Sequence, residues 1–507
     1  RQALGDDVEP LLRRMAKSGA LHCKKEQSRK VRDKVVLFAR LAVPAEEALA
    51  LAGKSQRRRE AVTFLAQNGE TALHDVTYFT GVSRQTLNAL EKLGAVAYRE
   101  QEEYRISEKQ YTVKAEELTL NDQQQRVCDT LLAQVRTETP GVTLLRGVTG
   151  SGKTVVYIRL AQELLKIGRS VMILVPEIAL TPQMLRRFTA QFGSDVAMLH
   201  SALPLTERYD QWKRIRRGEV RVVLGTRSAV FAPLQNLGLI IMDEEQEHTY
   251  RSESAPRYSA HEVARQRAAE NGALLLLASA TPSTESFYAA QNGRTQLVRL
   301  TKRYGGNPLP SVQIVDMRAE LASGNPREIS LAMEDAIRRN LDAGKQTILL
   351  LNRRGYQTMA QCEDCREVLK CQKCSVPMVY HKSAHKVLCH YCGNQMEPPT
   401  VCPTCGGKLQ YWGFGTQKAE EELAKLFPDA RVLRMDQDST AAKDAHEKLL
   451  AKFADHEYDI MVGTQMVAKG LDFEDVTLVG VLGIDSLLFA QGFRAYENVF
   501  SLITQVV

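Results

Sequence analysis

The amino-acid sequence predicts an α/β protein in which two parallel-sheet regions are joined to smaller domains. Short apolar runs alternate with amphipathic stretches from residue 118 to residue 300, and the same alternation returns from residue 346 to residue 482. Near-continuous apolar runs are typical of strands that are buried on both faces of a parallel sheet. The chain has 507 residues, which is enough for about three or four domains.

The composition is that of a globular protein without a membrane-spanning segment. Apolar residues make up 44% of the chain and charged residues 25%, which are ordinary values for a soluble domain. We find no run of about 18 apolar residues, so we expect no membrane partner. The chain begins RQALG, without an initiator Met or the apolar core of a secretion signal. We therefore expect a cytoplasmic protein and a chain that is a fragment or a processed product.

The net charge of +7 is concentrated at the N-terminus. Residues 1–60 hold 15 basic and 8 acidic residues, a difference of +7, so the other 447 residues hold 52 of each. A local basic excess is expected of a nucleic-acid-binding surface. A solvated basic surface without a partner explains the same count.

The N-terminal region predicts several short elements. A helix is expected over residues 8–20, followed by a strand at residues 21–23. Further helices are expected over 57–67, 73–79 and 84–93, the last capped by Ser83 and ended by Gly94. Residues 95–97 and 104–106 flank a polar turn and predict a two-stranded wing. Three helices and a hairpin make a winged helix over residues 54–112.

The third of these helices would be the recognition helix of a DNA-binding domain. It carries Arg84, Gln85 and Asn88, side chains that suit contacts with DNA. The helix is only mildly basic, and winged helices also serve protein contacts, so both uses stay open.

Ten strands are predicted for the two sheets. The first region has candidate strands at 142–146, 170–175, 196–199, 220–224, 237–242 and 273–278. The second has them at 346–351, 430–435, 458–462 and 476–482. A Gly- and Pro-rich linker at 305–310 separates the regions.

A phosphate-binding loop follows the first predicted strand. Residues 147–154 read GVTGSGKT, and the loop opens a predicted helix, which is the context that this pattern requires. Its small residues Gly147, Gly150, Ser151 and Gly152 let backbone N–H groups surround the phosphates of ATP. Lys153 and Thr154 would reach the β- and γ-phosphates and Mg²⁺.

Two acidic residues follow an apolar strand of the same region. Asp243 and Glu244 come directly after residues 239–242, which read LIIM. Beside a phosphate-binding loop, one acid at a strand end holds Mg²⁺ and a second orients the attacking water. We assign Asp243 to the metal and Glu244 to the water.

Eight of the ten Cys form four Cys-x-x-Cys pairs within 44 residues. Each such turn presents two thiolates to one tetrahedral ion, so eight ligands predict two structural Zn²⁺ ions rather than disulfides. Spacing alone does not choose among the three ways of pairing the turns. His381, His385 and His390 lie nearby but are surplus to two four-thiolate sites. The pairs are Cys362/Cys365, Cys371/Cys374, Cys389/Cys392 and Cys402/Cys405.

Taken together, these motifs resemble those of superfamily 2 helicases. The resemblance implies two RecA-like lobes that clamp ATP between them and a DNA strand across their tops. It marks Gln124 as the adenine reader and Ser279-Ala280-Thr281 as the segment that couples hydrolysis to strand movement. It also marks strand-gripping segments at 176–181 and 225–228, with Thr226 and Arg227, and at 463–470, with Thr464, Gln465 and Lys469.

Within that superfamily the chain resembles the PriA family of bacterial primosomal replication-restart helicases over nearly its whole length. The most specific stretches are DEEQEH at 243–248, LNRRGY at 351–356, the Cys pairs, and GTQMVAKG at 463–470. The family has a DNA-sensing aromatic loop, which Tyr250, Arg257 and Tyr258 match; local packing of the tyrosines is the alternative. The family pattern nests the Cys pairs: 362/365 with 402/405, and 371/374 with 389/392.

The resemblance divides the chain into five parts. These are a basic DNA-binding remnant or linker at 1–53, the winged helix at 54–112, lobe 1 at 113–304, lobe 2 at 305–358 and 410–507, and a zinc-binding insertion at 359–409. The family's N-terminal 3′-end-binding domain is absent or reduced here. Because the chain stops before the Gly- and Arg-rich motif whose arginine completes the ATP site, we expect this chain to be a poor ATPase.

The function implied is that of an ATP-driven 3′→5′ DNA helicase that recognises stalled forks and initiates primosome assembly. Its partners would be forked and single-stranded DNA, single-stranded DNA-binding protein, and primosome and helicase-loader proteins, at the bacterial nucleoid. Two alternatives stay open: another superfamily 2 translocase, for example one acting on RNA, and a fork-binding scaffold that recruits the loader with ATPase activity secondary.

Overall fold

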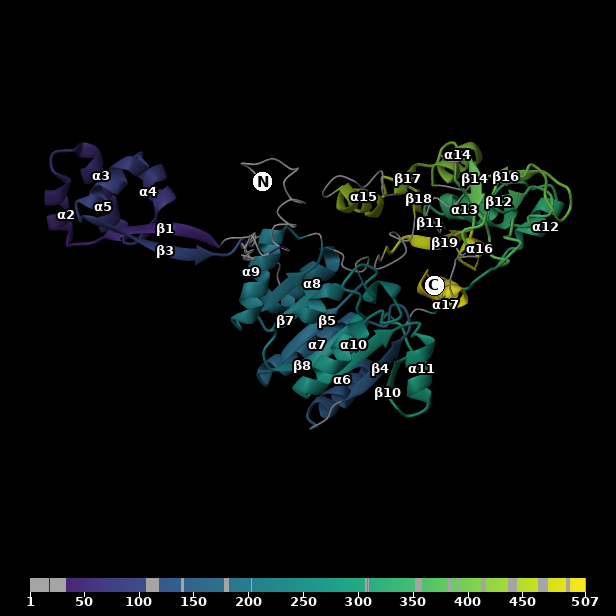
Figure 1. Cartoon of the computed structure of the whole chain (residues 1–507), viewed down its shortest axis with the longest axis horizontal. Helices are drawn as coiled ribbons and strands as arrows, with labels where there is room; N and C mark the ends of the chain where they lie inside the picture. The colour runs from purple at the N-terminus through teal and green to yellow at the C-terminus, as the bar shows by residue number, and fades with distance from the viewer. Residues whose placement is uncertain are drawn as a thin grey trace. The chain divides into compact units, whose positions relative to one another are not determined.

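The computed structural model describes residue 18 and residues 33–105, 118–137, 141–176, 182–201, 203–305, 308, 310–351, 358–381, 385–389, 392–411, 416–435, 445–463, 473–488 and 493–506. Two compact units are present (Figure 1). Unit 1 comprises residues 1–107 and 202–213, and unit 2 comprises residues 108–201 and 214–507. None of the helices described is long and apolar enough to cross a membrane.

The described residues of unit 1 form a three-stranded antiparallel sheet with helices α2 to α5, and most of α9 (Leu205–Arg216) also belongs to this unit. Strands β1 and β3 form a long two-stranded ribbon (Figure 1), and the order in the sheet is β2-β1-β3. Helix side chains such as Val62, Leu65, Val76, Leu87 and Leu90 make its core. Its elements are β1 (Lys34–Leu41), α2 (Ala45–Ala52), α3 (Gln56–Asn68), β2 (Thr71–Ala72), α4 (Leu73–Thr80), α5 (Arg84–Lys92) and β3 (Val96–Glu103).

The three helices predicted for this region form within about two residues of their expected bounds. The Ser83 side chain accepts a hydrogen bond from the Thr86 N–H at 3.4 Å, as an N-cap residue should. The predicted wing is wrong in its pairing. Strand β3 runs straight through the polar stretch that was expected to turn, and it pairs with β1 along eight residues, from Leu41↔Val96 to Lys34↔Glu103.

The polar composition of β3 explains this error. Glu100, Gln101 and Glu103 are exposed on the ribbon, so the strand carries no apolar alternation that would distinguish it from a turn. The expected remnant at 1–53 is also shorter than predicted, because β1 and α2 belong to the folded unit. The helix and strand predicted over residues 8–23 lie outside the described residues, apart from Ser18.

Unit 2 contains a seven-stranded parallel sheet in the order β10-β4-β9-β8-β5-β7-β6. All six strands predicted for this region form within about two residues of their expected bounds. Strand β10 was not predicted, because it lies at an edge and only its last residue is buried. The strands are β4 (Val142–Gly147), β5 (Ser170–Leu174), β6 (Val196–Leu199), β7 (Val222–Gly225), β8 (Leu237–Asp243), β9 (Leu274–Ser279) and β10 (Gln296–Leu300).

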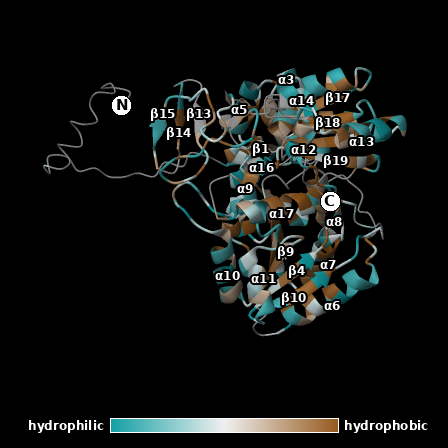
Figure 2. Cartoon of the chain, turned by 90° about the vertical axis from the view of Figure 1, so that its right-hand side faces the viewer, coloured by the Kyte–Doolittle hydropathy of each residue, from teal (hydrophilic) through white to brown (hydrophobic). Residues whose placement is uncertain are grey.

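Helices cover both faces of this sheet. Side chains of α6 (Asp122–Val135), α7 (Lys153–Lys166) and α8 (Pro182–Phe192) pack in one core cluster. The other cluster includes α10 (Ala260–Asn271) and the 3₁₀ segment Arg227–Phe231. Helix α11 (Thr284–Gln291) follows β9. Helix α6 shows a hydrophobic and a hydrophilic side (Figure 2), as expected of a helix that packs on a sheet.

A second parallel sheet has the order β17-β18-β11-β19, and its four strands confirm the predicted ones. They are β11 (Gln346–Leu351), β17 (Val432–Met435), β18 (Ile460–Gly463) and β19 (Val476–Leu482). The helices of this region are α12 (Met317–Ala322), α13 (Leu331–Asp342), α14 (Thr416–Leu426), α15 (Ala445–Ala454), α16 (Asp485–Leu488) and α17 (Ala495–Val506). Two parallel sheets within one chain confirm the α/β fold class.

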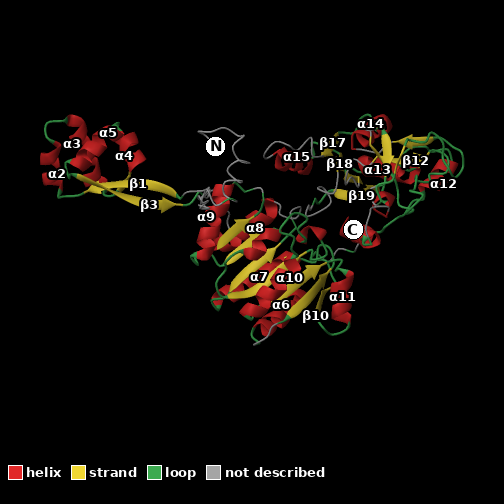
Figure 3. Cartoon of the chain, in the orientation of Figure 1, coloured by secondary structure: helices red, strands yellow, loops and turns green. Residues whose placement is uncertain are grey.

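The Cys-rich segment is inserted between β11 and α14. It forms short antiparallel strands in the order β15-β14-β13-β12-β16, drawn in yellow around β12 in Figure 3. Its buried core is small and includes Cys371 and Cys389. The strands are β12 (Thr358–Cys362), β13 (Val379–His381), β14 (Lys386–Leu388), β15 (Gln395–Met396) and β16 (Leu409–Tyr411).

Candidate nucleotide-binding and zinc sites

The loop between β4 and α7 has the tight backbone that phosphate binding requires. Gly150 and Gly152 have φ angles of +69° and +74°, which favour glycine. A Cβ atom on Gly147 would lie 2.7 Å from Ser151 Oγ, and one on Gly152 would lie 2.4 Å from Gln124 Nε2. The glycines are therefore needed both for backbone conformation and for space.

The side chains of this loop are arranged to receive an anion. Lys153 Nζ donates a hydrogen bond to the Gly147 carbonyl at 3.2 Å and lies 3.9 Å from Glu244 Oε1. Thr154 lies in the first turn of α7. Ser151 Oγ is buried and has no hydrogen-bond partner within the described part of the chain. A buried hydroxyl without a partner is costly, and a phosphate oxygen would satisfy it.

The predicted metal-binding acid lies at the carboxyl end of β8. Tyr157 Oη donates a hydrogen bond to Asp243 Oδ1 at 2.8 Å. Burial, reinforced by the adjacent charge of Glu244, raises the pKa of Asp243 to about 6. A bound cation would stabilise the ionised form of such a buried carboxylate, so the Asp243 site fits Mg²⁺.

The chain turns sharply at Glu244, whose φ angle is +45°. Glu244 Oε2 accepts hydrogen bonds from Gln246 Nε2 at 2.9 Å and from Gln505 Nε2 at 2.8 Å. The amide oxygen of Gln246 in turn accepts a hydrogen bond from Ser279 Oγ at 2.6 Å. The acidic turn is thus hydrogen-bonded to the segment that follows β9 and to helix α17.

The segment 279–281 extends this network. Ser279 Oγ accepts a hydrogen bond from the Thr281 N–H at 2.9 Å, and the hydroxyls of Thr281 and Ser501 are 2.8 Å apart. Through these bonds a change at Glu244 has a direct hydrogen-bonded route to α17. The position suits the coupling role expected for Ser279-Ala280-Thr281.

Glu245 had no predicted role, and the structure makes it a buried anchor for α11. Only 2% of Glu245 is exposed. Its carboxylate accepts hydrogen bonds from the Ser283 N–H at 2.6 Å and from Ser286 Oγ at 2.9 Å. Burial acts to raise its pKa, but the hydrogen bonds from His261 and Ser283 outweigh that effect and hold the pKa below its usual value.

The structure places Gln124 beneath the loop rather than in an open base pocket. Gln124 is fully buried; its Nε2 donates to the Ser151 carbonyl at 3.0 Å, and its Oε1 accepts from the Asn121 N–H at 3.0 Å. Each end of the amide makes one of these bonds and keeps capacity for a second, so the contact of Gln124 with adenine stays a prediction. Its place in the helix-capping box of α6 explains its position beneath the loop.

A segment without any predicted role also contacts the loop. Arg303 Nε donates to the Thr149 carbonyl at 3.3 Å, and the Tyr304 N–H donates to the Gly150 carbonyl at 2.8 Å. These residues follow β10, the edge strand that the sequence did not predict. No local pattern distinguishes them from an ordinary loop.

Among the residues expected to contact DNA, Arg227 and Tyr258 lie together. The guanidinium carbon of Arg227 is 5.8 Å from the centre of the Tyr258 ring. The Tyr258 ring packs edge-on against Phe231, with ring centres 4.9 Å apart. Arg257 is exposed. Phe231 is 46% exposed and was not predicted. Thr226, by contrast, is buried at the end of β7.

Tyr250 is not available for DNA contact in this structure, so that prediction is corrected. The ring is 1% exposed, and its hydroxyl donates to the carbonyl oxygens of Leu174 at 2.9 Å and Asp243 at 2.6 Å. The ring packs in the core because the chain folds back under β8, which the spacing of aromatic residues cannot reveal. Thr464, Gln465 and Lys469 lie outside the described residues, as do 177–181 and 352–356.

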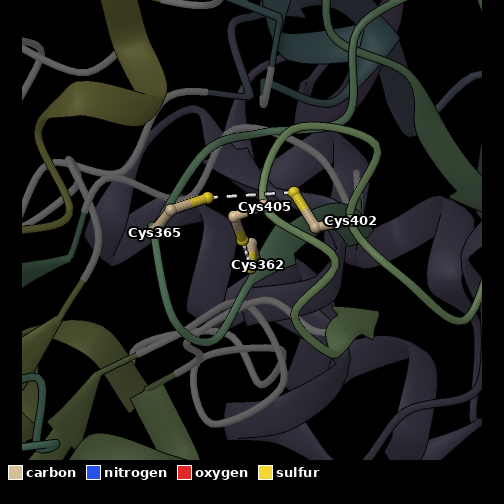
Figure 4. Close-up of side chains that lie close together, drawn as sticks. All are labelled: Cys362, Cys365, Cys402 and Cys405. Carbon is tan, nitrogen blue, oxygen red and sulfur yellow. Dashed lines mark hydrogen bonds between the residues drawn. The ribbon is translucent and has the colours of Figure 1, made fainter.

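The eight paired cysteines form two groups of four sulfur atoms. Within each group, all sulfur atoms lie within 4.8 Å of one another, and the groups are those of the nested pattern. Sulfur atoms are 3.4 Å apart for Cys362 and Cys405 and 3.8 Å apart for Cys365 and Cys402 (Figure 4). A tetrahedral Zn²⁺ with Zn–S bonds of about 2.3 Å places its ligands about 3.8 Å apart. Both groups therefore fit Zn²⁺.

All four Cys-x-x-Cys turns share one backbone geometry. The N–H of each first Cys donates to the carbonyl five residues later, for example Cys371 to Val376 and Cys389 to Asn394, both at 2.8 Å. The residue after each second Cys has a positive φ angle; these residues are Arg366, Ser375, Gly393 and Gly406. Hydrogen bonds from backbone N–H groups lower the pKa of Cys371 and of Cys402 to about 6, whereas burial and hydrogen bonds among the sulfur atoms raise the pKa of Cys374 to about 12. Metal binding would displace the protons that remain on each group, because the thiolate is the form that binds metal.

The histidines near the cysteines are not needed as ligands. His385 Nδ1 lies 2.9 Å from Tyr380 Oη, and neither metal-binding group described includes a histidine. His390 lies outside the described residues. Spacing alone leaves three pairings of the turns open, and the structure selects the nested one, in which β12 lies beside β16.

Comparison with known protein families supports the two main sites. The DEAD/DEAH box helicase family matches residues 121–288, which include the phosphate-binding loop and the acidic turn. The PriA DNA helicase Cys-rich region (CRR) domain matches residues 371–396.

Curated relatives extend the similarity to most of the chain. The replication restart protein PriA of Bacillus subtilis is 44% identical over 430 residues, covering 84% of this chain and 53% of the relative. PriA of Synechocystis is 42% identical over 458 residues, covering 88% and 55%. PriA of Treponema pallidum is 43% identical over 364 residues, covering 71% and 54%. The chain spans about half the length of the curated relatives it matches.

Proposed function

The chain belongs to the family of the replication restart protein PriA, and we propose that it forms the motor of an ATP-dependent 3′→5′ DNA helicase. The helicase would recognise stalled or abandoned replication forks, unwind DNA and initiate primosome assembly. One observation carries this proposal: Lys153 Nζ lies 3.9 Å from Glu244 Oε1, so the phosphate-binding loop and the acidic turn meet at the carboxyl edge of one parallel sheet. Nucleotides bind at this edge in open α/β sheets.

The residues at this edge divide the work of ATP hydrolysis. Backbone N–H groups of the loop and Lys153 would hold the phosphates, and Ser151 Oγ would donate to a phosphate oxygen. Glu244 would orient the attacking water, since its carboxylate faces Lys153. Mg²⁺, held by Asp243 and Thr154, would supply charge neutralisation at the β- and γ-phosphates.

The network from Glu244 to α17 would transmit the state of the nucleotide. Its hydrogen bonds run from Glu244 through Gln246 and Ser279 to Thr281 and Ser501. A change in the partner of Glu244 during hydrolysis would alter the hydrogen bonds along this line. Movement of α17 relative to the seven-stranded sheet would then follow each cycle of hydrolysis.

Contacts with DNA are proposed for both units. In unit 2, Arg257 and Tyr258, with Arg227 behind the ring, would contact a single strand by charge and stacking. Thr226, Thr464, Gln465 and Lys469 would contact the strand backbone. In unit 1, helices α3 to α5 would act as a winged helix with α5 against DNA, and the basic residues before β1 would add electrostatic attraction.

The Cys-rich insertion would hold two structural Zn²⁺ ions, one in each group of four thiolates. Because every ligand position of a tetrahedral ion is filled by sulfur, these ions have no open site for catalysis. The insertion would act at the fork in strand separation and in binding partners. The partners proposed are single-stranded DNA-binding protein and primosome and helicase-loader proteins, at the nucleoid.

A strand-separation assay tests the proposed function. Forked DNA and forked RNA of the same sequence are offered to the zinc-loaded chain with ATP and Mg²⁺. We expect slow separation of the DNA fork, because this chain is expected to be a poor ATPase, and no separation of the RNA fork. Lys153→Ala is expected to separate neither fork. Equal or better separation of RNA would support a different superfamily 2 translocase. A Lys153→Ala protein that still bound forks and supported replication restart would instead support the scaffold alternative.

A further inference from the structure

Residues 301–304 form a strap that crosses the phosphate-binding loop. Thr301 and Gln123 exchange two hydrogen bonds, from the Thr301 N–H to Gln123 Oε1 at 3.1 Å and from Gln123 Nε2 to Thr301 Oγ1 at 3.0 Å. Two residues later the strap reaches the loop itself, through the bonds from Arg303 and Tyr304 to the loop carbonyls. The strap is therefore held at both of its ends.

The side chain of Tyr304 is fixed, yet half of it faces solvent. Its hydroxyl donates to the Thr119 carbonyl at 3.2 Å and lies 3.3 Å from Thr119 Oγ1. Its ring carbon Cδ2 is 3.6 Å from the point where a Cβ on Gly152 would lie. With backbone and hydroxyl both anchored, the residue is still 51% exposed. A rigid aromatic ring thus stands directly beside the loop that surrounds the phosphates.

The position of Gln124 makes this ring important. Gln124 is fully buried beneath the loop, whereas Tyr304 is 51% exposed beside it, so the Tyr304 ring is the more accessible of the two groups to the base of a bound nucleotide. Thr119 and Tyr304 border the loop on the side of the segment that leads into α6. In a nucleotide whose phosphates are bound by the loop, one ribose joins the base to the phosphates. The base is therefore within reach of the Tyr304 ring at this border.

We propose that the ring of Tyr304 stacks on the base of the nucleotide bound at the phosphate-binding loop. This inference rests on the proposed ATP-binding function and identifies the group that contacts the base. An exposed aromatic ring offers a base its flat face without requiring a particular pattern of donors and acceptors. Tyr304 would therefore favour nucleotides over phosphate chains without a base, and it would discriminate little between adenine and guanine.

Binding of ATP and of inorganic tripolyphosphate to the full, zinc-loaded chain tests the proposal. Both are titrated calorimetrically in Mg²⁺ against the unchanged protein, Tyr304→Ala and Tyr304→Phe. The matched control is Tyr288→Ala, which removes another exposed tyrosine, from α11. Stacking predicts that Tyr304→Ala weakens ATP binding by about 5- to 150-fold and leaves tripolyphosphate binding unchanged, whereas Tyr304→Phe and Tyr288→Ala bind both as before.

Three results would overturn the stacking proposal while leaving ATP binding intact. The first is an unchanged ATP affinity in Tyr304→Ala. The second is an equal loss for ATP and tripolyphosphate, which would make the strap only a support for the loop. The third is a loss in Tyr304→Phe as large as in Tyr304→Ala, which would assign the effect to the hydroxyl. An unchanged protein that binds no ATP would overturn the proposed function together with this inference.

Discussion

Glu245 offers the sharpest test of how the acidic turn is built. Replacing it by Ala removes a carboxylate that accepts short hydrogen bonds from the Ser283 N–H at 2.6 Å and from Ser286 Oγ at 2.9 Å. It also removes the partner of His261, whose Nε2 lies 3.5 Å away. The Ser283 N–H would be left buried without an acceptor, at the point where α11 begins.

The expected loss follows from these contacts. A hydrogen bond to a charged group contributes about 1.5–3 kcal/mol, and a carboxylate at a helix N-terminus adds about 0.3–1 kcal/mol. Two short bonds and the helix term give about 3–7 kcal/mol. We expect about 4 kcal/mol for Glu245→Ala. For Glu245→Gln, which keeps one acceptor oxygen, we expect about 1–2 kcal/mol.

Hydrogen–deuterium exchange of the full chain measures this loss locally. The free energy of opening is read from amides of α11, so the unfolding of other domains does not obscure the result. Glu270→Gln is the matched control, because Glu270 is an exposed acid of α10, and surface changes of this kind are usually within about 0.5 kcal/mol. If the amides of α11 were as well protected from exchange in Glu245→Ala as in Glu270→Gln, the anchoring role of Glu245 would be refuted.

Three further predictions concern the loop, the zinc sites and the basic segment. Gly152→Ala should weaken ATP binding at least about tenfold, because its Cβ would lie 2.4 Å from Gln124 Nε2. The control Gly168→Ala, with the same φ of +74° but nothing within 4 Å of its Cβ, should bind ATP normally. Equal ATP affinities of the two variants in calorimetry would contradict this. Metal analysis should find two Zn²⁺ per chain and one after Cys371→Ser, while Cys128→Ala, outside both groups, should keep two; one ion in the unchanged chain would break the assignment. Replacing Lys24, Lys25, Arg29 and Lys30 by Gln should weaken fork binding and reduce its salt dependence by up to about four phosphate contacts, and an unchanged salt slope would show that this segment is only a solvated surface.

Substitution of the four basic residues is a cleaner test of the basic segment than deletion of residues 1–60. That deletion would remove β1, the central strand of the unit 1 sheet, together with α2. Loss of fork affinity would then reflect an unfolded domain rather than lost charge. Substitutions before β1 change the charge and leave the described sheet intact.

The strands of both parallel sheets could be predicted because burial on two faces demands continuous apolar runs. Strands β10 and β3 could not, since an edge strand and an exposed ribbon tolerate polar residues. The site residues likewise divide into those that a local motif defines and those that only the tertiary structure places. Lys153 and Asp243 are defined by the chemistry of their local motifs, and the cysteines by the ligand number of zinc.

The roles of other residues depend on contacts between segments distant in sequence. Tyr250 and Tyr258 are both tyrosines of one short stretch, yet the fold buries the first and leaves the second partly exposed. Gln124 is positioned by the capping of α6, and Tyr304 by a strap that follows an unpredicted strand. Such placements require the tertiary structure, because no local spacing encodes them.

The most direct test of the central claim is ATP hydrolysis measured with and without forked DNA, for the unchanged chain and for Lys153→Ala. If the loop at 147–154 and the acidic turn at 243–244 form the ATP site of a DNA motor, forked DNA will raise the rate of the unchanged chain, whatever its absolute value. Lys153→Ala will show no stimulated hydrolysis. Equal rates in the two proteins, or a rate that forked DNA does not change, would contradict the account.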